Sequence, residues 1–305
     1  MNERAFRRQE LRAIGRALTP EAVAASEALW ADAALRAVRA DTKVRRDLAY
    51  GEHARHRLDL FLPPGTGGTA PPAVFLFVHG GGFTDGDKHR AGSHLYDNVG
   101  HWAAARGLAA VNINYRLAPE HGWPSAAEDI ARAIDWLGAQ AQALGLDASR
   151  IVLAGHSAGA AHVAGYIAHR GRHSAGYRRL RGAVLLSGIY DIPAMGSRPS
   201  VQAYYGGDPA HHAARSSADG LAEAELPLLL TVAEEDPDGF HAQALTLLRH
   251  IEARRKRLPA FCLVPDHNHF TQVFHLGSDD SLLAHFLALF LEANLGAFTD
   301  VGARP

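Results

Sequence analysis

The 305-residue sequence contains one cysteine, almost no net charge and no long apolar run. Cys262 alone cannot form a disulfide within the chain, which excludes a disulfide-stabilised scaffold and suits a reducing compartment such as the cytoplasm. Lys and Arg total 31 and Asp and Glu total 32, so no basic field is available to attract nucleic acid or an anionic membrane. No stretch approaches the roughly 18 uncharged apolar residues of a membrane-spanning helix, and residues 1–16 lack the apolar core of a secretory signal. We therefore expect a cytoplasmic protein that acts on a small molecule.

What the sequence does contain is typical of a globular chain. Hydrophobic residues make up 47% and charged residues 21%, which argues against disordered or fibrous proteins. Histidine is abundant, with 19 residues. Because histidine titrates near neutrality, the net charge of the protein should be more positive near pH 6 than near pH 8.

Short apolar runs alternate with helical patterns from about residue 57 onward. This alternation predicts an α/β protein with a mostly parallel sheet and helices on both faces. Strands are predicted at 57–62, 73–78, 108–114, 151–154, 183–187, 228–232 and 260–264. Helices are predicted at 91–106, 125–143, 158–170, 239–256 and 281–294, and the second of these opens on a capping box formed by Ser125 and Glu128.

An alanine-rich helix precedes this pattern. Thr19, followed by proline, is typical of a helix N-terminus, and the helix is expected to end near Arg39. We therefore divide the chain into an N-terminal helical extension at 1–45, a candidate lid, a main α/β domain at 46–297 and a tail at 298–305.

Two segments are candidates for the wall of a substrate pocket. In the extension, Leu29 and Trp30 either cap such a pocket or pack against the domain. The stretch from Ile189 to Glu225 is a long insertion between two strands, and long loops in compact domains are usually functional or mobile. Its candidate pocket residues are Tyr190, Tyr204 and Tyr205.

One pentapeptide joins a predicted strand directly to a predicted helix. Gly155-His156-Ser157-Ala158-Gly159 follows the strand 151–154. Its small residues fit a sharp turn that strains the serine backbone and raises the hydroxyl above the carboxyl edge of the sheet. Ser157 is therefore the candidate nucleophile.

A second motif, His79-Gly80-Gly81-Gly82-Phe83, follows the strand 73–78. Three glycines allow backbone N–H groups to point into a cavity and let a substrate approach without meeting a Cβ atom. A phosphate-binding loop would end in Gly-Lys followed by Ser or Thr, whereas this loop continues with Thr84 and Asp85. The motif favours a site for a developing negative charge.

A nucleophilic serine needs a base, and the base needs an orienting acid. Candidates follow two further predicted strands. The acids after strand 228–232 are Glu234, Glu235, Asp236 and Asp238. The histidines after strand 260–264 are His267 and His269.

Together these motifs make residues 55–295 resemble an α/β-hydrolase of the hormone-sensitive-lipase-like esterase group, with similarity to bacterial feruloyl esterases and kynurenine formamidases. The resemblance is carried by the two glycine motifs and by Gly86-Asp87-Lys88, Asn114-Tyr115-Arg116-Leu117-Ala118-Pro119-Glu120, Asp236-Pro237 and His269-Phe270. The sequence departs from the lipase-like pattern after His269, where the usual glycine is missing.

The resemblance implies roles for individual residues. Asp236 would be the acid, with Glu234, Glu235 and Asp238 as alternatives. His269 would be the base, with His267 as the alternative. The backbone amides of Gly81, Gly82 and Ala158 would stabilise the oxyanion.

The implied function is that of a serine carboxylesterase that hydrolyses small or short-acyl esters through an acyl-serine intermediate, without a cofactor or metal. An arylformamidase or amide hydrolase with the same triad is the alternative, because the residues after the histidine resemble the formamidase relatives. An alternative of another class is a non-catalytic binding protein on a hydrolase fold. The expected partner is a small-molecule ester, and a homodimer is left open.

Most of the other histidines are interpreted as surface or loop residues. His79 is expected to hold the glycine loop and His156 to line the nucleophile turn. The pairs considered as metal ligands are His267 with His269, His53 with His56, and His211 with His212. A metal is set aside because the sequence has no second cysteine and no His-Glu-x-x-His pattern.

Overall fold

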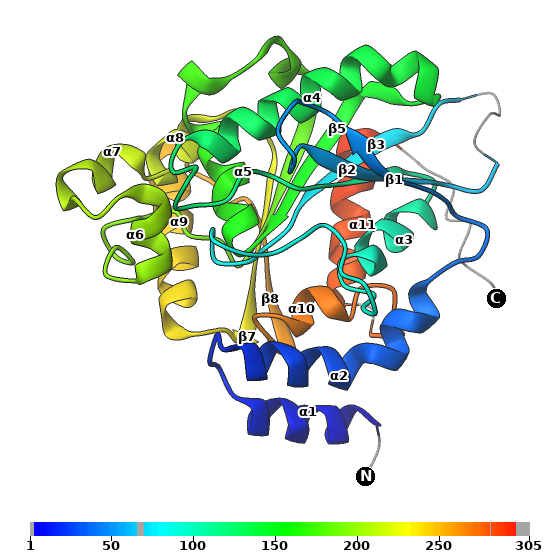
Figure 1. Ribbon diagram of the computed structural model, residues 1–305. Coiled ribbons are helices and arrows are strands. Elements are labelled where there is room, and N and C mark those ends of the chain that lie inside the picture. Colours follow the sequence, from blue (N-terminus) through cyan, green and yellow to red (C-terminus); the bar gives the residue numbers. More distant parts are fainter. Residues whose placement is uncertain (1–2, 66–69, 281, 297–305) are drawn as a thin grey trace.

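The computed structural model describes residues 3–65, 70–280 and 282–296. Within these ranges an eight-stranded sheet runs through the molecule in the order β1-β2-β4-β3-β5-β6-β7-β8 (Figure 1). The strands are β1 (Lys43–Ala49), β2 (Arg57–Leu62), β3 (Ala73–Val78), β4 (Ala109–Ile113), β5 (Asp147–His156), β6 (Leu180–Leu186), β7 (Leu228–Glu235) and β8 (Ala260–Asn268). β2 pairs antiparallel with β1 and β4, and all other pairs are parallel. The predicted mostly parallel sheet is confirmed.

Helices cover both faces of the sheet in the described residues (Figure 1). They are α1 (Glu3–Ile14), α2 (Pro20–Ala37), α3 (Asp97–Ala104), α4 (Ser125–Leu144), α5 (Ala158–Ala168), α6 (Pro199–Tyr205), α7 (His212–Arg215), α8 (Ala218–Glu223), α9 (Asp238–Arg255), α10 (Thr271–Phe274) and α11 (Leu282–Leu295). Short 3₁₀ helices lie at Arg170–Arg172, Ala175–Arg179 and Pro209–His211. No helix within these ranges combines the length and apolarity needed to cross a bilayer.

The core has two layers, one on each side of the sheet. Alternate side chains of β3 divide between them: Val74 and Leu76 pack with α4, α5 and α9, whereas Phe75 and Phe77 pack with α3 and α11. Because both faces of β3 are buried, its sequence is a continuous apolar run and does not alternate.

Several sequence predictions of local structure were wrong or incomplete. β1 was missed because this edge strand is mostly exposed and carries no apolar period. The capping box does not form: the Ser125 hydroxyl donates to the carbonyl of His121, and Glu128 pairs with Arg116. The insertion after β6 folds into the short helices α6 to α8. The expected tail at 298–305 lies outside the described residues.

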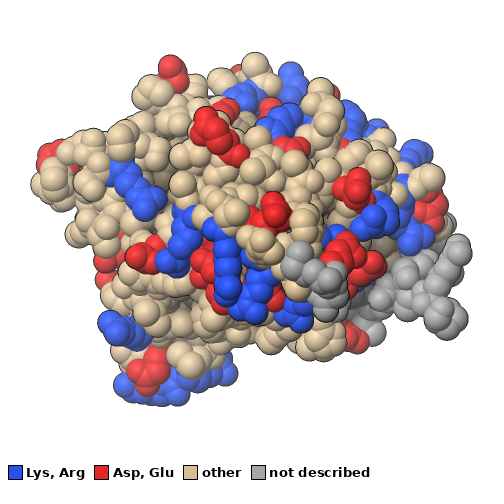
Figure 2. Space-filling view, turned by 90° about the horizontal axis from the view of Figure 1, so that it is seen from below, with Lys and Arg blue, Asp and Glu red and all other residues tan. Residues whose placement is uncertain are grey.

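The N-terminal helices lie at the end of the sheet where β7 and β8 finish (Figure 1). α2 packs on α10, and α1 packs on α2 and on β8. Figure 2 looks onto this end of the molecule and shows acidic and basic side chains interspersed. The predicted absence of a large basic field therefore holds on this face.

Candidate active site

Ser157 occupies a strained turn between β5 and α5. Its φ of 55° and ψ of −120° lie in a region that non-glycine residues rarely adopt. The turn also needs small neighbours, because a Cβ atom at Gly159 would clash with the backbone oxygens of Val78 and His79, and one at Gly155 would clash with the backbone of Gly159. The spacing of glycines around the serine thus follows from close backbone packing.

The structure brings Ser157, His269 and Asp236 together in one row of hydrogen bonds. Ser157 Oγ lies 2.8 Å from His269 Nε2, and His269 Nδ1 lies 2.6 Å from Asp236 Oδ1. A carboxylate can only accept, so Nδ1 carries the proton and Nε2 is left to accept the serine hydroxyl. Asp236 and the His269 ring are buried.

Asp236 is held by further buried donors. Its Oδ2 accepts hydrogen bonds from the Ser187 hydroxyl at 2.5 Å and from the backbone N–H of Ala233 at 2.7 Å. Burial alone would raise the pKa of Asp236, but its electrostatic interaction and hydrogen bond with His269, together with these two hydrogen bonds, outweigh burial and hold the pKa below its ordinary value. The carboxyl group therefore stays ionised beside the imidazole.

The alternative acids lie elsewhere. Glu234 accepts a hydrogen bond from the backbone N–H of Asp266, and both Glu235 and Asp238 pair with Arg16 of the N-terminal segment. Among the contacts of the described residues, none of the three alternatives reaches His269.

The alternative base, His267, also faces away from the serine. Its Nδ1 lies 3.1 Å from the hydroxyl of Thr271 and its Nε2 lies 3.4 Å from Asp280. His267 and His269 are only two residues apart, yet their rings contact different residues. Their spacing in the sequence did not reveal this difference.

The glycine motif forms an open turn above Ser157. Gly81 and Gly82 have φ values of 133° and 59°, and a Cβ atom at Gly81 would clash with the backbone of Asp85. In the part of the chain that the structure describes, the backbone N–H groups of Gly81, Gly82 and Ala158 donate to no protein acceptor. Gly81 and Gly82 line the same cavity as Ser157, so unpaired donors are available beside the nucleophile.

Comparisons with known proteins agree with this geometry. A family model described as BD-FAE matches residues 58–181. Ethyl acetate hydrolase of Pseudomonas putida is 32% identical over 219 residues, which are 63% of this chain and 64% of that protein. Esterase LipI of Mycobacterium tuberculosis is 38% identical over 117 residues, covering 38% of this chain and 35% of LipI. The chain thus spans less than two thirds of each of these relatives.

Solved structures of similar shape cover most of the chain. Esterase B from Lactobacillus Rhamnosis superposes with a TM-score of 0.70 at 22% identity, over 90% of this chain and 97% of that one. The chain has the α/β-hydrolase fold. A bacterial esterase of the hormone-sensitive lipase family superposes with a TM-score of 0.69 at 23% identity, over 96% and 98% of the two chains. The predicted resemblance to this esterase group is confirmed.

A row of buried hydrogen bonds that the sequence did not reveal connects four segments of the candidate site. The N–H of Gly80 donates to the Tyr96 hydroxyl at 3.0 Å, and this hydroxyl lies 3.1 Å from His156 Nδ1. His156 Nε2 lies 2.8 Å from the backbone carbonyl of His269. Since a carbonyl only accepts, Nε2 carries the ring proton and Nδ1 accepts from Tyr96.

The protonation of this row is set by burial. Burial, with His269 nearby, lowers the pKa of His156 to about 3, and burial raises the pKa of Tyr96 to about 12. Near pH 7 His156 is therefore neutral and Tyr96 keeps its proton, so the donor and the acceptor of each hydrogen bond in this row stay the same. Tyr96 carried no motif, and its role became visible only from the contacts.

His79 and Arg55 hold the glycine loop from behind. His79 Nδ1 lies 2.6 Å from the carbonyl of Gly80, and Arg55 donates to the carbonyls of Gly86 at 2.8 Å and Tyr115 at 2.7 Å. These contacts match the structural role expected of His79.

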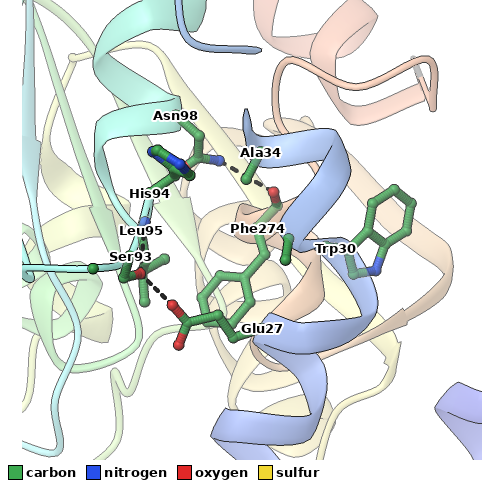
Figure 3. Close-up of a pocket in the computed structure, with 10 residues that line it drawn as sticks. Glu27, Trp30, Ala34, Ser93, His94, Leu95, Asn98 and Phe274 are labelled. Atoms are coloured by element: carbon green, nitrogen blue, oxygen red, sulfur yellow. Dashed lines mark hydrogen bonds between the residues drawn. The ribbon is translucent and has the colours of Figure 1, made fainter. Parts of the chain in front are cut away.

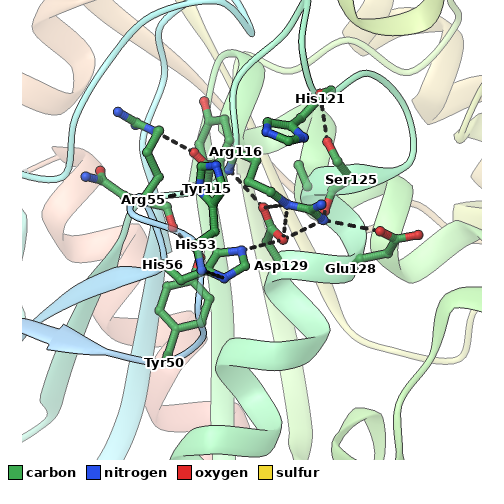
Figure 4. Close-up of polar contacts among 12 residues, drawn as sticks. Tyr50, His53, Arg55, His56, Tyr115, Arg116, His121, Ser125, Glu128 and Asp129 are labelled. Carbon is green, nitrogen blue, oxygen red and sulfur yellow. Dashed lines mark hydrogen bonds and ion pairs between the residues drawn. The ribbon is translucent and has the colours of Figure 1, made fainter.

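A neighbouring polar cluster explains one of the histidine pairs that we considered as metal ligands (Figure 4). His56 Nε2 lies 2.9 Å from Asp129, which also accepts from the backbone N–H and the guanidinium of Arg116. His53 Nδ1 instead accepts from the backbone N–H of Arg55. The two rings lie against each other, with centroids 5.4 Å apart, and their ring nitrogens form hydrogen bonds with other protein groups.

The site opens into a cavity of about 720 Å³ that contains Ser157 and His269 in its wall. Val23, Ala24 and Glu27 of α2 also line this cavity, together with Phe270 and Phe274. The extension therefore borders the site, although neither Leu29 nor Trp30 lines this cavity in the described residues.

A second, smaller cavity of about 70 Å³ adjoins the first (Figure 3). Glu27, Leu95 and Phe274 line both cavities, and Trp30 lines the smaller one. Glu27 reaches across from α2 to accept hydrogen bonds from Ser93 and Arg90. Glu27 thus ties the N-terminal extension to the loop before α3.

The three tyrosines proposed as pocket residues are instead core residues. Tyr190, Tyr204 and Tyr205 are all buried, and Tyr204 stacks on Phe83 with ring centroids 5.2 Å apart. From this insertion Ser200 is the residue that lines the cavity.

Proposed function

We propose that this α/β-hydrolase is a serine carboxylesterase that hydrolyses small or short-acyl carboxylic esters through an acyl-serine intermediate. The observation that carries the proposal is the row of hydrogen bonds from Ser157 through His269 to Asp236, at the wall of a cavity of about 720 Å³. Similarity to an ethyl acetate hydrolase supports small esters as the substrate class.

The proposed reaction begins when Ser157 Oγ attacks the ester carbonyl carbon. His269 Nε2 takes the serine proton as the bond forms, and Asp236 stabilises the resulting imidazolium while remaining ionised. The carbon–oxygen bond to the alcohol then breaks, and His269 returns the proton to the leaving alcohol. A water molecule then attacks the carbonyl carbon of the acyl-serine while His269 takes its proton. The bond between this carbon and Ser157 Oγ breaks, His269 returns the proton to the serine, and the carboxylic acid is released.

The negative charge that develops on the carbonyl oxygen needs donors that are already in place. We assign this role to the backbone N–H groups of Gly81, Gly82 and Ala158, which have no protein acceptor in the described structure. Loss of one such donor costs about 3 kcal/mol of transition-state stabilisation in comparable sites. The row through Tyr96 and His156 positions the loop that supplies two of them.

The deciding experiment compares wild-type protein with Ser157→Ala on p-nitrophenyl acetate and butyrate. We expect the variant to lose nearly all turnover, whereas Ser149→Ala, an exposed serine elsewhere in β5, should match the wild type. Wild-type turnover in Ser157→Ala would refute the proposal. Failure of a fluorophosphonate probe to label Ser157 would favour the binding-protein alternative, and faster turnover of N-formylkynurenine than of esters would favour the formamidase.

We also propose that the helical extension at 1–45 acts as a lid on the domain at 46–297. Support comes from α2, which borders the cavity through Val23, Ala24 and Glu27. A lid that moves during turnover should become less accessible to protease when a phosphonate inhibitor occupies Ser157.

For the assembly we propose a homodimer formed through β8. β8 is an edge strand of the sheet, and Phe261 and Leu263 on it have exposed fractions of 37% and 49%. Unprotected apolar edge strands tend to pair with another chain. Light scattering should report a dimer, and Leu263→Lys should shift it to a monomer.

We propose a cytoplasmic location for the protein. Its one cysteine, Cys262, is buried, so folding requires no oxidising compartment. Fractionation of the source cells would test this assignment.

A further inference from the structure

Three side chains that can bind metal converge beside the hydrolase site, where β8, α10 and the segment before α11 meet. They are His267, His275 and Asp280, and one ligand atom of each lies within 4.8 Å of the other two. Both rings are buried, and the Asp280 side chain is 30% exposed. We propose that these three side chains bind a divalent transition-metal ion, with Zn²⁺ as the preferred ion.

The strongest single observation is the unsatisfied nitrogen of His275. Its Nδ1 lies 2.8 Å from the backbone carbonyl of Thr271, so Nδ1 carries the proton and Nε2 keeps a lone pair. The residue is fully buried, and Nε2 has no hydrogen-bond partner among the described residues. A buried acceptor without a partner destabilises the fold, and a bound cation would satisfy it.

The gap between His267 and Asp280 also suits an ion. His267 Nε2 lies 3.4 Å from Asp280 Oδ2, whereas a direct charge-assisted hydrogen bond is usually about 2.7–2.9 Å long. Two ligand atoms that are each about 2.1 Å from a zinc ion, at a tetrahedral angle, lie about 3.4 Å apart. The observed separation therefore matches two ligands that share one ion.

Thr271 orients both imidazole rings toward this point. Its backbone carbonyl accepts from His275 Nδ1, and its hydroxyl lies 3.1 Å from His267 Nδ1. Metal-binding histidines characteristically use their second ring nitrogen in this way, which fixes the ring and exposes the other nitrogen to the ion. Thr271 thus fixes the orientation of both histidine ligands.

The surroundings favour zinc over a hard cation. Two imidazole nitrogens and one carboxylate suit Zn²⁺, while Mg²⁺ and Ca²⁺ prefer oxygen ligands. Arg7 lies over Trp30 at 4.1 Å, and Trp30 packs on both histidine rings, so the positive charge of Arg7 opposes binding. Arg4 and Arg8 also line the adjoining cavity, but both pair with Asp266. Asp280 supplies a compensating negative charge, and a cavity of about 730 Å³ lined by Trp30, Asp279 and Asp280 provides access.

A bound ion would connect the end of β8 to α10 and to the segment before α11. His267 lies two residues before His269, so the ion would hold the strand end that carries the proposed base. We therefore expect the ion to raise the melting temperature of the protein.

The test uses untagged full-length protein that has been stripped with a chelator and dialysed. Zn²⁺ is titrated by calorimetry, and Co²⁺ is added in parallel to detect ligand-field absorption. The variants are His275→Phe, which keeps a ring in the stack, and Asp280→Asn, whose side chain is partly exposed. Asp279→Asn is the matched control, because it lines the same cavity but is not one of the three ligands.

We expect one equivalent of Zn²⁺ to bind the wild type and the Asp279→Asn control with similar affinity. Binding at this site should be lost in His275→Phe and be at least tenfold weaker in Asp280→Asn. Each variant is checked for folding by circular dichroism. Absence of a saturable one-equivalent site in the wild type would overturn the proposal. So would unchanged affinity in both variants, because other histidines would then bind the ion.

Discussion

Replacing Asp236 with asparagine should abolish the proposed ester hydrolysis, because the ring proton of His269 would move from Nδ1 to Nε2. The backbone N–H of Ala233 donates to Asp236 Oδ2 at 2.7 Å and cannot turn away, so the amide oxygen of Asn must occupy that position. The amide nitrogen then faces His269 Nδ1, where the carboxylate oxygen lay at 2.6 Å. Because this nitrogen donates, Nδ1 must accept and the ring proton moves to Nε2.

The consequence follows from the distance between His269 Nε2 and Ser157 Oγ, which is 2.8 Å. A protonated Nε2 donates to the serine and cannot accept its proton. In a serine hydrolase with this geometry the wrong tautomer lowers kcat by about 10⁴-fold, which corresponds to about 5.4 kcal/mol. We expect a loss of this size for Asp236→Asn on p-nitrophenyl butyrate near pH 7.5.

Matched variants separate this explanation from a general loss of acidic charge. Glu235→Gln and Asp238→Asn remove neighbouring carboxylates that pair with Arg16, and both should keep kcat within about twofold of the wild type. Circular dichroism and urea denaturation check that Asp236→Asn is folded. If folded Asp236→Asn retained more than a tenth of wild-type kcat, or if Glu235→Gln lost as much, the assignment of the acid would be wrong.

Three further predictions concern stability, positioning and pocket size. Burial lowers the pKa to about 4 in His79 and to about 3 in His156 and His162. Below about pH 6.5 these three rings become protonated in the unfolded chain but stay neutral in the folded protein. The free energy of unfolding should therefore fall by about 2 kcal/mol per ring as the pH is lowered from 7 to 5. Urea titrations that superpose at the two pH values would contradict this. Tyr96→Phe removes the donor to His156 and should lower kcat more than it changes KM, and an unchanged kcat in steady-state assays would argue against a positioning role. Val23 lines the cavity, so Val23→Trp should narrow it and lower kcat/KM for p-nitrophenyl octanoate more than for the acetate. The control Leu35→Trp, at an exposed position of α2, should leave both kcat/KM values unchanged. An equal loss on the two esters would argue against Val23 as part of the cavity wall.

Local sequence was sufficient where one short segment decides the structure. The run from Ala73 to Val78 predicts a strand that is buried on both faces, because no polar residue interrupts it. The glycines around Ser157 likewise predict the turn, since only small residues allow the backbone of α5 to approach β3. In both cases the physical cause acts within a few residues of the pattern.

Local sequence was insufficient where surroundings decide between similar residues. Glu235 and Asp236 are adjacent in the chain, yet Asp236 is buried under the donors Ser187 and Ala233 while Glu235 faces solvent and Arg16. Their chemistry is nearly the same, so the difference in role comes from contacts made by other elements.

The sequence by itself determined the strand–turn–helix unit that carries Ser157 and the order in which serine, acids and histidines follow the strands. Only the tertiary structure decided that His269 faces Ser157 while His267 faces Asp280, and that Tyr96 connects the glycine loop to His156. The physical reason is that Ser157 and His269 are 112 residues apart and meet only because parallel strands end at the same edge of the sheet. Side-chain direction at that edge depends on what each element packs against.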